Sequence, residues 1–452
     1  MLAKHGIAAR HGSVRAKVLN MAWPAIVDQT LAMVIGIVDT AMVGRLGAQA
    51  LASVGLAAQL MQASIAVFGA VTTGTTALVA RFIGAQDPEQ AQDTARQSML
   101  FGAGLAASVA AILLLFAPGV LRGLFGSSEA EVLAGAAQYV RIVALALVPN
   151  FLLIVSNGIM RGSGDTRTPM QIMALMNVVN ICFNWLLIYG VGPFPALGIR
   201  GAAISTAISQ TAGSAAALTI LIRGKTVLKV RFNNLRPDFK VLRRVLRIGV
   251  PAGVEQIMMQ SAQIIYTMII ASLGTVAYAA HRVALNAESL SFMPGFGFAL
   301  AATALVGQSL GAEDPQGAER AGGEAARLAV MSMGTMGLTF FLMPQFFTSL
   351  FTNDAEVIIS SAGVLRIVGL AQPFLALTMV LGGALRGAGD TRAVLAITVL
   401  GVTTARIGVA YTLVRLGFGL VGAWIGMAVD LAVRGSLLLF RFKRGSWKHL
   451  RV

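Results

Sequence analysis

Five acidic side chains lie inside long apolar stretches of this sequence: Asp28, Asp39, Glu255, Glu288 and Asp430. A carboxylate at the centre of a bilayer costs about 2.5–3.5 kcal/mol on insertion scales, so such residues generally face the protein interior and serve ion or substrate binding. Burial also favours the neutral form of a carboxyl group, which allows it to take up and release a proton. These residues therefore predict cation or proton binding inside a membrane protein.

Asp39 is the strongest of these candidates, in the segment IGIVDTAMVGRLG toward the outer end of the first apolar run. In the fifth run, Asn177, Asn180 and Asn184 recur at helical spacing and so share one helix face. Their amide oxygens can bind Na⁺ or accept a hydrogen bond from a protonated carboxyl group, and interhelical hydrogen bonding is the alternative. Thr206 in the sixth run has the same two interpretations.

The other four carboxylates have different settings. Asp28 and Glu255 each follow a helix proline by four residues, so they are candidates either for the substrate cleft or for an early helical turn near the cytoplasmic surface. Glu288 lies deeper, about seven residues into the eighth run. Asp430 precedes Arg434 by four residues, which predicts a structural ion pair on one helix.

The composition indicates what kind of protein contains these carboxylates. Of the 452 residues, 56% are apolar and 12% are charged, whereas soluble domains have about 45–50% and about 25%. This excludes a soluble enzyme, a disordered chain and a nucleic-acid-binding domain. No catalytic, metal-binding or cofactor-binding pattern is apparent, so we expect no enzymatic activity and no cofactor other than a coupling ion, H⁺ or Na⁺.

Apolar runs of about 20 residues are long enough to cross a bilayer as helices, which satisfy their own backbone hydrogen bonds. The sequence therefore predicts an all-α integral membrane protein. Twelve transmembrane helices are expected, at residues 18–42, 53–80, 95–117, 132–158, 169–190, 200–222, 246–271, 281–308, 323–344, 357–384, 393–415 and 420–440.

The chain also repeats itself. WPAIVDQ at 23–29 returns as VPAGVEQ at 250–256, and GAQDP at 84–88 returns as GAEDP at 311–315, each 227 residues later. TALVA and TALVG at 76–80 and 303–307 have the same offset, and MRGSGDTR at 160–167 returns as LRGAGDTR at 385–392. Each half holds six spans, so the halves insert in the same sense and are related by a pseudo-two-fold axis along the membrane normal.

The duplication divides the chain into an N-lobe at 1–222, a basic linker at 223–245 and a C-lobe at 246–452. Alternate connections, the basic segment 223–247 and both termini carry 26 of the 35 Lys and Arg residues. The positive-inside rule therefore predicts that both termini and the linker are cytoplasmic, in a multi-pass protein of the cytoplasmic membrane. Two like lobes around a central cleft are typical of alternating access.

The two lobes, the VDTAMVGRLG segment, the paired RG-x-GDTR turns and the PAGVEQ opening of the seventh span resemble the MATE family of multidrug and toxic-compound extrusion transporters. The resemblance covers nearly the whole chain. It implies cation-driven antiport, in which H⁺ or Na⁺ enters as an organic, often cationic compound leaves. We also expect a monomer in the lipid bilayer with a small-molecule organic substrate and no nucleic-acid partner.

The resemblance assigns roles to individual residues of the N-lobe. Asp39 matches the family's aspartate of the first span, and Asn180 and Thr206 match residues of the same cation site. Asn184 stands where many members carry a second aspartate. The site then has one formal negative charge, which favours H⁺ over Na⁺ as the coupling ion.

The C-lobe departs from the pattern of NorM-type members. Met259 stands where they carry a glutamate of the seventh span, and Leu375 replaces their aspartate of the tenth. Glu255, Gln256, Glu288 and Met259, together with Asp28, are therefore expected only as residues of the substrate cleft, with a second cation site from Glu255 and Glu288 as a further possibility.

Two other functions are compatible with twelve spans. A lipid-linked saccharide flippase of the same wider superfamily tends to have extra spans or a cleft rich in Arg and Lys, whereas few basic residues lie within the spans of this chain. An ion channel would conduct without a countertransported substrate. The sequence favours the antiporter.

Overall fold

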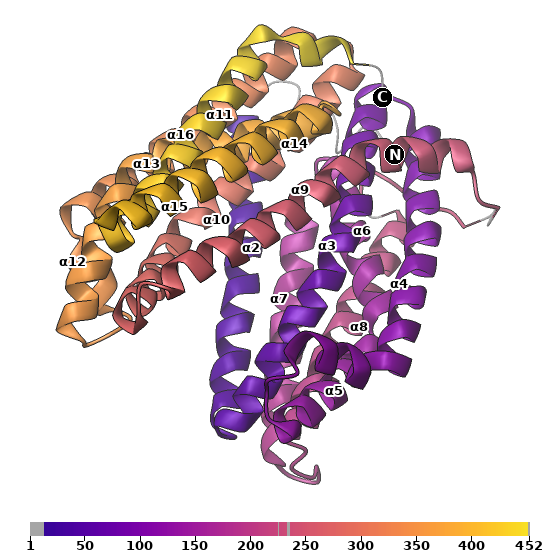
Figure 1. Ribbon diagram of the computed structural model, residues 1–452. Coiled ribbons are helices and arrows are strands. Elements are labelled where there is room, and N and C mark those ends of the chain that lie inside the picture. The colour runs from indigo at the N-terminus through magenta and orange to yellow at the C-terminus, as the bar shows by residue number, and fades with distance from the viewer. Residues whose placement is uncertain (1–12, 225, 233–235, 451–452) are drawn as a thin grey trace.

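The computed structural model describes residues 13–224, 226–232 and 236–450, which form helices and loops without a strand (Figure 1). Part of the basic N-terminus that the orientation prediction uses, at residues 1–12, lies outside the described residues. The first half of the chain contains the helices α2 (Val14–Gly44), α3 (Ala48–Gly84), α4 (Pro88–Phe125), α5 (Ala130–Ala144), α6 (Leu147–Gly162), α7 (Arg167–Tyr189) and α8 (Ile199–Arg223).

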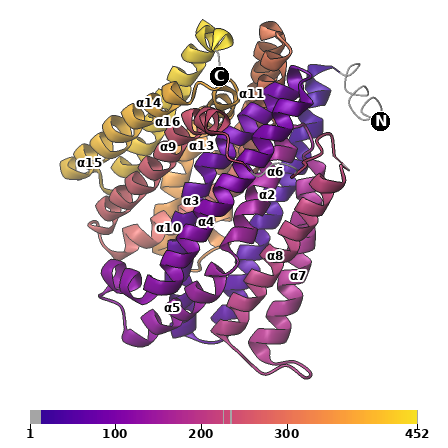
Figure 2. The ribbon, with the colours of Figure 1, turned by 90° about the vertical axis from the view of Figure 1, so that its right-hand side faces the viewer.

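The second half begins after the linker and repeats this order. Its segments are α9 (Phe239–Ala271), α10 (Thr275–Gly311), α11 (Pro315–Leu342), α12 (Pro344–Ser349), α13 (Ala355–Gly387), α14 (Thr391–Leu400), the π-helix η2 (Gly401–Val409), α15 (Ala410–Leu413), the π-helix η3 (Val414–Phe418), α16 (Gly419–Arg444) and the 3₁₀ turn η4 (Ser446–His449). In Figures 1 and 2, α14–α16 and α7–α8 lie on opposite sides of the molecule.

Nine segments of the described chain are long and apolar enough to span a membrane, and the pair α5–α6 adds a tenth. One of the nine, residues 391–444, is two helices, because Gly417 at φ 91° breaks it before α16. The 33-residue α9 is a further helix, in addition to these segments. The described helices therefore provide the twelve predicted spans.

The span predicted at 132–158 is not one straight helix. α5 and α6 meet at an angle of 58° across a short break. Pro149 explains the position of the break, because proline has no N–H to bond the carbonyl four residues earlier and its ring clashes there. That carbonyl belongs to Leu145, the residue that caps the end of α5.

The repeated GAQDP and GAEDP motifs form matching helix starts. Asp87 accepts a hydrogen bond from the backbone N–H of Gln90 at 3.0 Å, and Asp314 accepts one from Gly317 at 2.7 Å. A proline follows each aspartate in the first helical turn, where its missing N–H leaves no bond unmade. The two halves therefore begin α4 and α11 with the same cap.

The two lobes exchange apolar contacts at one end of the molecule. Val18 and Met21 of α2 belong to the core of the second half, and their repeat equivalents Val245 and Ile248 of α9 belong to the core of the first. This reciprocity is what a pseudo-two-fold relation between the halves requires.

Close backbone contacts reinforce the same end. A Cβ atom added to Gly84 would lie 1.9 Å from the carbonyl oxygen of Gln308, and one added to Gly311 would lie 1.9 Å from that of Arg81. Gly84 and Gly311 are repeat equivalents, as are Arg81 and Gln308. Only glycine allows α3 and α10 to approach this closely.

From this contact the two bundles diverge toward the opposite end (Figure 1). The C-terminal residues lie at the contact end, where the Arg81 side chain donates a hydrogen bond to the carbonyl of Leu450 at 2.8 Å. The turn after α6 lies there too, because Gln308 donates to the carbonyl of Gly162 at 2.9 Å.

Candidate functional site

A carboxylate and two amides meet between α2 and α7 in the first lobe. The Asn184 side chain donates hydrogen bonds to the Oδ1 atoms of Asp39, at 2.5 Å, and Asn180, at 2.8 Å. Both asparagines are 1% exposed, whereas Asp39 is half-buried. The structure thus brings together three of the four residues that the sequence proposed for the coupling site.

Neighbouring polar contacts hold this cluster in place. Asn177, on the same face of α7, donates to the carbonyl of Leu31 at 2.9 Å and ties α7 to α2. The Ser205 hydroxyl of α8 donates to the carbonyl of Asn180 at 2.8 Å. Because these bonds tie α7 to α2 and α8, they hold the part of α7 that carries the asparagines beside Asp39.

Thr206 stands at the edge of the cluster. Its hydroxyl donates to the carbonyl of Ala202 at 3.0 Å and lies 3.3 Å from the hydroxyl of Tyr139. Tyr139, on α5, interacts electrostatically with Asp39. Sequence patterns do not identify this tyrosine, because a position in a short amphipathic segment gives no signal of its role.

The Asp39 carboxylate can therefore act in a defined way. Its Oδ1 atom accepts from Asn184, and no residue of the described chain donates a hydrogen bond to its Oδ2 atom. A half-buried carboxylate with one oxygen held and the other available can bind a proton or help to coordinate a small cation.

Asp28 and Glu255 occupy equivalent places in the two lobes. Asp28, 1% exposed, forms an ion pair with Arg161 of α6. Glu255, 7% exposed, pairs with Arg386 of α13 at 2.7 Å and accepts from the Thr398 hydroxyl at 3.1 Å. The sequence proposed both carboxylates for the cleft without naming these partners, although each arginine opens a repeated RG-x-GDTR turn.

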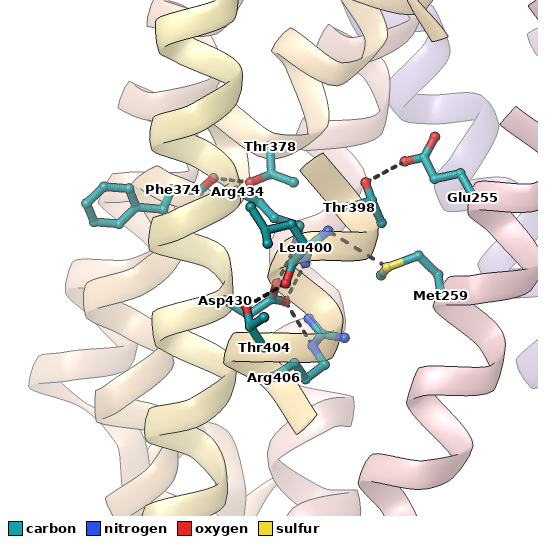
Figure 3. Close-up of polar contacts among 10 residues, drawn as sticks. All are labelled: Glu255, Met259, Phe374, Thr378, Thr398, Leu400, Thr404, Arg406, Asp430 and Arg434. Atoms are coloured by element: carbon teal, nitrogen blue, oxygen red, sulfur yellow. Dashed lines mark hydrogen bonds and ion pairs between the residues drawn. The ribbon is translucent and has the colours of Figure 1, made fainter. Parts of the chain in front are cut away.

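A third ionic cluster lies inside the second lobe (Figure 3). The Asp430 carboxylate accepts from Arg434 at 2.7 Å through each of its two oxygens, which confirms the predicted pair, and from Arg406 at 3.0 Å. Asp430 is 0% exposed, and the arginines are 6% and 4% exposed. Arg406, inside the eleventh predicted span, is therefore neutralised by a carboxylate from α16.

The remaining candidates lie on α9 and α10. The Met259 sulfur lies 3.8 Å from a guanidinium nitrogen of Arg434, Gln256 is exposed, and Glu288 is 2% exposed on α10. The described residues contain no group of three or more His, Cys, Asp and Glu side chains that could hold a metal ion.

Comparison with known proteins identifies the family. The family model described as MatE matches residues 24–186 and 251–412, once in each half. A probable multidrug resistance protein NorM from Thermotoga maritima is 33% identical over 442 residues, which cover 97% of this chain and 94% of that protein. A protein of the same name from Rhodopseudomonas palustris is 32% identical over 438 residues, covering 94% and 91%.

Solved structures have the same fold. A MOP superfamily transporter from Pyrococcus furiosus superposes with a TM-score of 0.90 at 24% identity, over 99% of both chains. A multidrug resistance MATE family transporter, solved in an outward-facing conformation, gives the same score, identity and coverage. With two family matches, full-length relatives and this architecture of two six-helix lobes, the chain belongs to the MATE family of membrane transporters.

Proposed function

We propose that the protein is a cation-coupled antiporter that exports organic, often cationic drugs or metabolites across the cytoplasmic membrane by alternating access. H⁺ is favoured over Na⁺ as the coupling ion. The observation that carries this proposal is the half-buried Asp39 carboxylate, held by Asn184 through one oxygen. The multidrug resistance names of the full-length relatives support export of drugs.

The charge count at this site favours the proton. Asp39 supplies one negative charge. Asn184, which bonds it, is neutral, and so are the other proposed members of the site, Asn180 and Thr206. A proton needs only one carboxyl group, whereas a site for Na⁺ must replace the hydration shell of the ion. Protonation removes the charge of Asp39 and changes which conformation it stabilises, which links proton binding to the transport cycle.

The ion pairs of the lobes argue against the flippase. Arg161 and Arg386 are engaged by Asp28 and Glu255, and Arg406 and Arg434 by Asp430. A pyrophosphate-linked substrate needs arginines that can bind its phosphates. These arginines are neutralised by carboxylates of the chain itself, so they favour a substrate that is not anionic.

Transport in proteoliposomes tests the choice of ion. With ethidium as the substrate, a pH gradient alone is expected to drive its transport against its own gradient, and a Na⁺ gradient at equal pH on both sides is expected to leave it at the level of protein-free liposomes. Transport driven by Na⁺ and not by the pH gradient would refute proton coupling.

The contact between the lobes predicts an effect on the conformational cycle. Gly84→Val is expected to separate α3 from α10, because even its Cβ would lie 1.9 Å from the carbonyl oxygen of Gln308. Overpacking of this kind destabilises a structure by about 1–3 kcal/mol, which shifts an equilibrium between two conformations by about 5–150-fold. Separation of the lobes is measured in a Cys182→Ala background in which the buried Ser163 is replaced by cysteine. This cysteine reacts faster with a maleimide when the lobes separate and expose it.

The matched control for this measurement is Gly104→Val, because a Cβ at Gly104 would meet no atom within 4 Å. We expect faster labelling in Gly84→Val and a rate like that of the parent protein in Gly104→Val. Equal labelling in all three proteins would mean that the glycine contact does not hold the lobes together.

A further inference from the structure

Glu288 is a buried carboxyl group that the proposed coupling site does not use. It is 2% exposed, and its Oε2 atom has no hydrogen-bond partner. An ionised carboxylate buried without hydrogen bonds loses much of its solvation energy, unless a positive charge nearby or a bound proton compensates. Its surroundings therefore determine which form it takes.

The charged groups around Glu288 come from three other segments. Arg406 of η2 and Tyr266 of α9 interact electrostatically with it. Asp430 and Arg434 of α16 continue the cluster through their ion pairs with each other and with Arg406. The two arginines and one aspartate leave one positive charge in surplus, and an ionised Glu288 would cancel it.

The other elements packed near this part of α10 are apolar. Ala284 and Ala287 belong to the same buried cluster as Val364 and Val368 of α13 and Phe340 of α11. On α10 itself, the His281 ring lies 5.7 Å from that of Tyr266, between ring centroids, and Arg282 is exposed. No group on these apolar faces offers Glu288 a further charge.

Several buried polar atoms on α10 and on the helices packed against it also lack a partner. The Tyr266 hydroxyl, both ring nitrogens of His281 and the indole nitrogen of Trp424 make no hydrogen bond, and all three side chains are 0% exposed. Trp424 continues the ring contacts, 5.6 Å from His281 between centroids. Buried donors and acceptors without a protein partner are where bound water molecules complete hydrogen bonds.

The repeat gives this pocket a counterpart in the other lobe. Tyr266 lies 227 residues after Asp39, so it takes the place of the N-lobe carboxylate on the equivalent helix. The C-lobe carries its unpaired carboxyl group on α10 instead. Arg406, which interacts electrostatically with it, lies in the π-helix η2, and π-helical turns occur frequently at functional sites.

We propose that Glu288 is a second proton-binding group, located in the C-lobe. When Glu288 gains a proton, its carboxylate becomes a neutral carboxylic acid and the charge of the cluster changes from zero to one positive. That charge repels an organic cation, so proton uptake at Glu288 promotes substrate release. This inference rests on the proposed proton-coupled antiport and extends it from one lobe to both.

Infrared difference spectra between about pH 6 and about pH 9 test the proposal directly, on the full-length protein in lipid without substrate. Exposed glutamates, with an ordinary pKa of about 4.3, stay ionised at both values. Wild type is expected to show the carboxylic acid C=O band of Glu288, and Glu288→Gln is expected to lose that component. Glu288→Asp should keep a shifted band, which shows that the loss is not caused by misfolding. The control Glu356→Gln, at an exposed carboxylate in the first turn of α13, should match wild type.

Identical spectra for wild type and Glu288→Gln would overturn the inference, and so would a band that is lost equally in Glu356→Gln. These outcomes are independent of the proposed function, which fails instead when a pH gradient drives no ethidium transport by the wild-type protein. If the infrared test and the ethidium test both give the expected results, the pH profile of transport should be shallower in Glu288→Gln than in wild type. The reason is that the variant binds one fewer proton.

Discussion

Asp39→Asn is expected to lower gradient-driven ethidium export to the level of protein-free liposomes, while the protein still folds and inserts. The asparagine has the same shape and can still accept the hydrogen bond from Asn184, so the packing of α2 against α7 is retained. It cannot take up a proton. The imposed gradient then has no means of changing the balance between the two conformations of the transporter.

Two further variants separate the charge from the hydrogen bond. Asp39→Glu keeps a carboxyl group and is expected to regain part of the export, whereas Asn184→Ala removes the donor and should weaken coupling without abolishing it. Export is measured at matched protein content, and thermal unfolding in detergent checks the fold. Normal export by a folded Asp39→Asn protein would refute the assignment.

Asp430→Leu is expected to reduce the free energy of unfolding by about 3–5 kcal/mol, because removal of one partner leaves a buried charge uncompensated. Asp430 is 0% exposed and is bonded by both Arg406 and Arg434. The substitution would leave two guanidinium groups, 6% and 4% exposed, without their common carboxylate. Unfolding by denaturant in mixed micelles measures the change.

The control replaces the whole ionic cluster. A triple variant with Asp430→Leu, Arg406→Met and Arg434→Met contains no buried charge at this place and should recover most of the lost stability, since apolar residues of similar volume often substitute for a buried ion cluster without loss. If Asp430→Leu alone were as stable as wild type, the cluster would not be a structural element of the C-lobe.

The sequence determined the helices and the duplication. Runs of apolar residues must be helical in a bilayer because only a helix satisfies its own backbone there. Motifs at a constant offset, such as GAQDP and GAEDP, predicted the duplication, and the structure shows that they form matching caps at Asp87 and Asp314. Contacts within one helix could also be predicted: the spacing of four residues between Asp430 and Arg434 places the two side chains on one face.

The contacts of the proposed coupling site were predicted in part. Helical spacing places Asn180 and Asn184 on one face of α7, and the resemblance to the family added Asp39. That the amide of Asn184 bonds both Asp39 and Asn180 depends on the packing of α2 against α7. Tyr139, which joins the cluster through Thr206, has no pattern in the sequence that marks it.

Only the tertiary structure decided which charges meet. Asp28 and Arg161 are 133 residues apart, and Glu255 and Arg386 are 131 apart. The periodicity of one helix says which face a residue occupies, but the partner across the interface depends on the register and crossing of two helices. The same is true of Arg406, whose partner Asp430 lies on α16, and of the unpaired Glu288, because a missing partner can be recognised only when every neighbour has been placed.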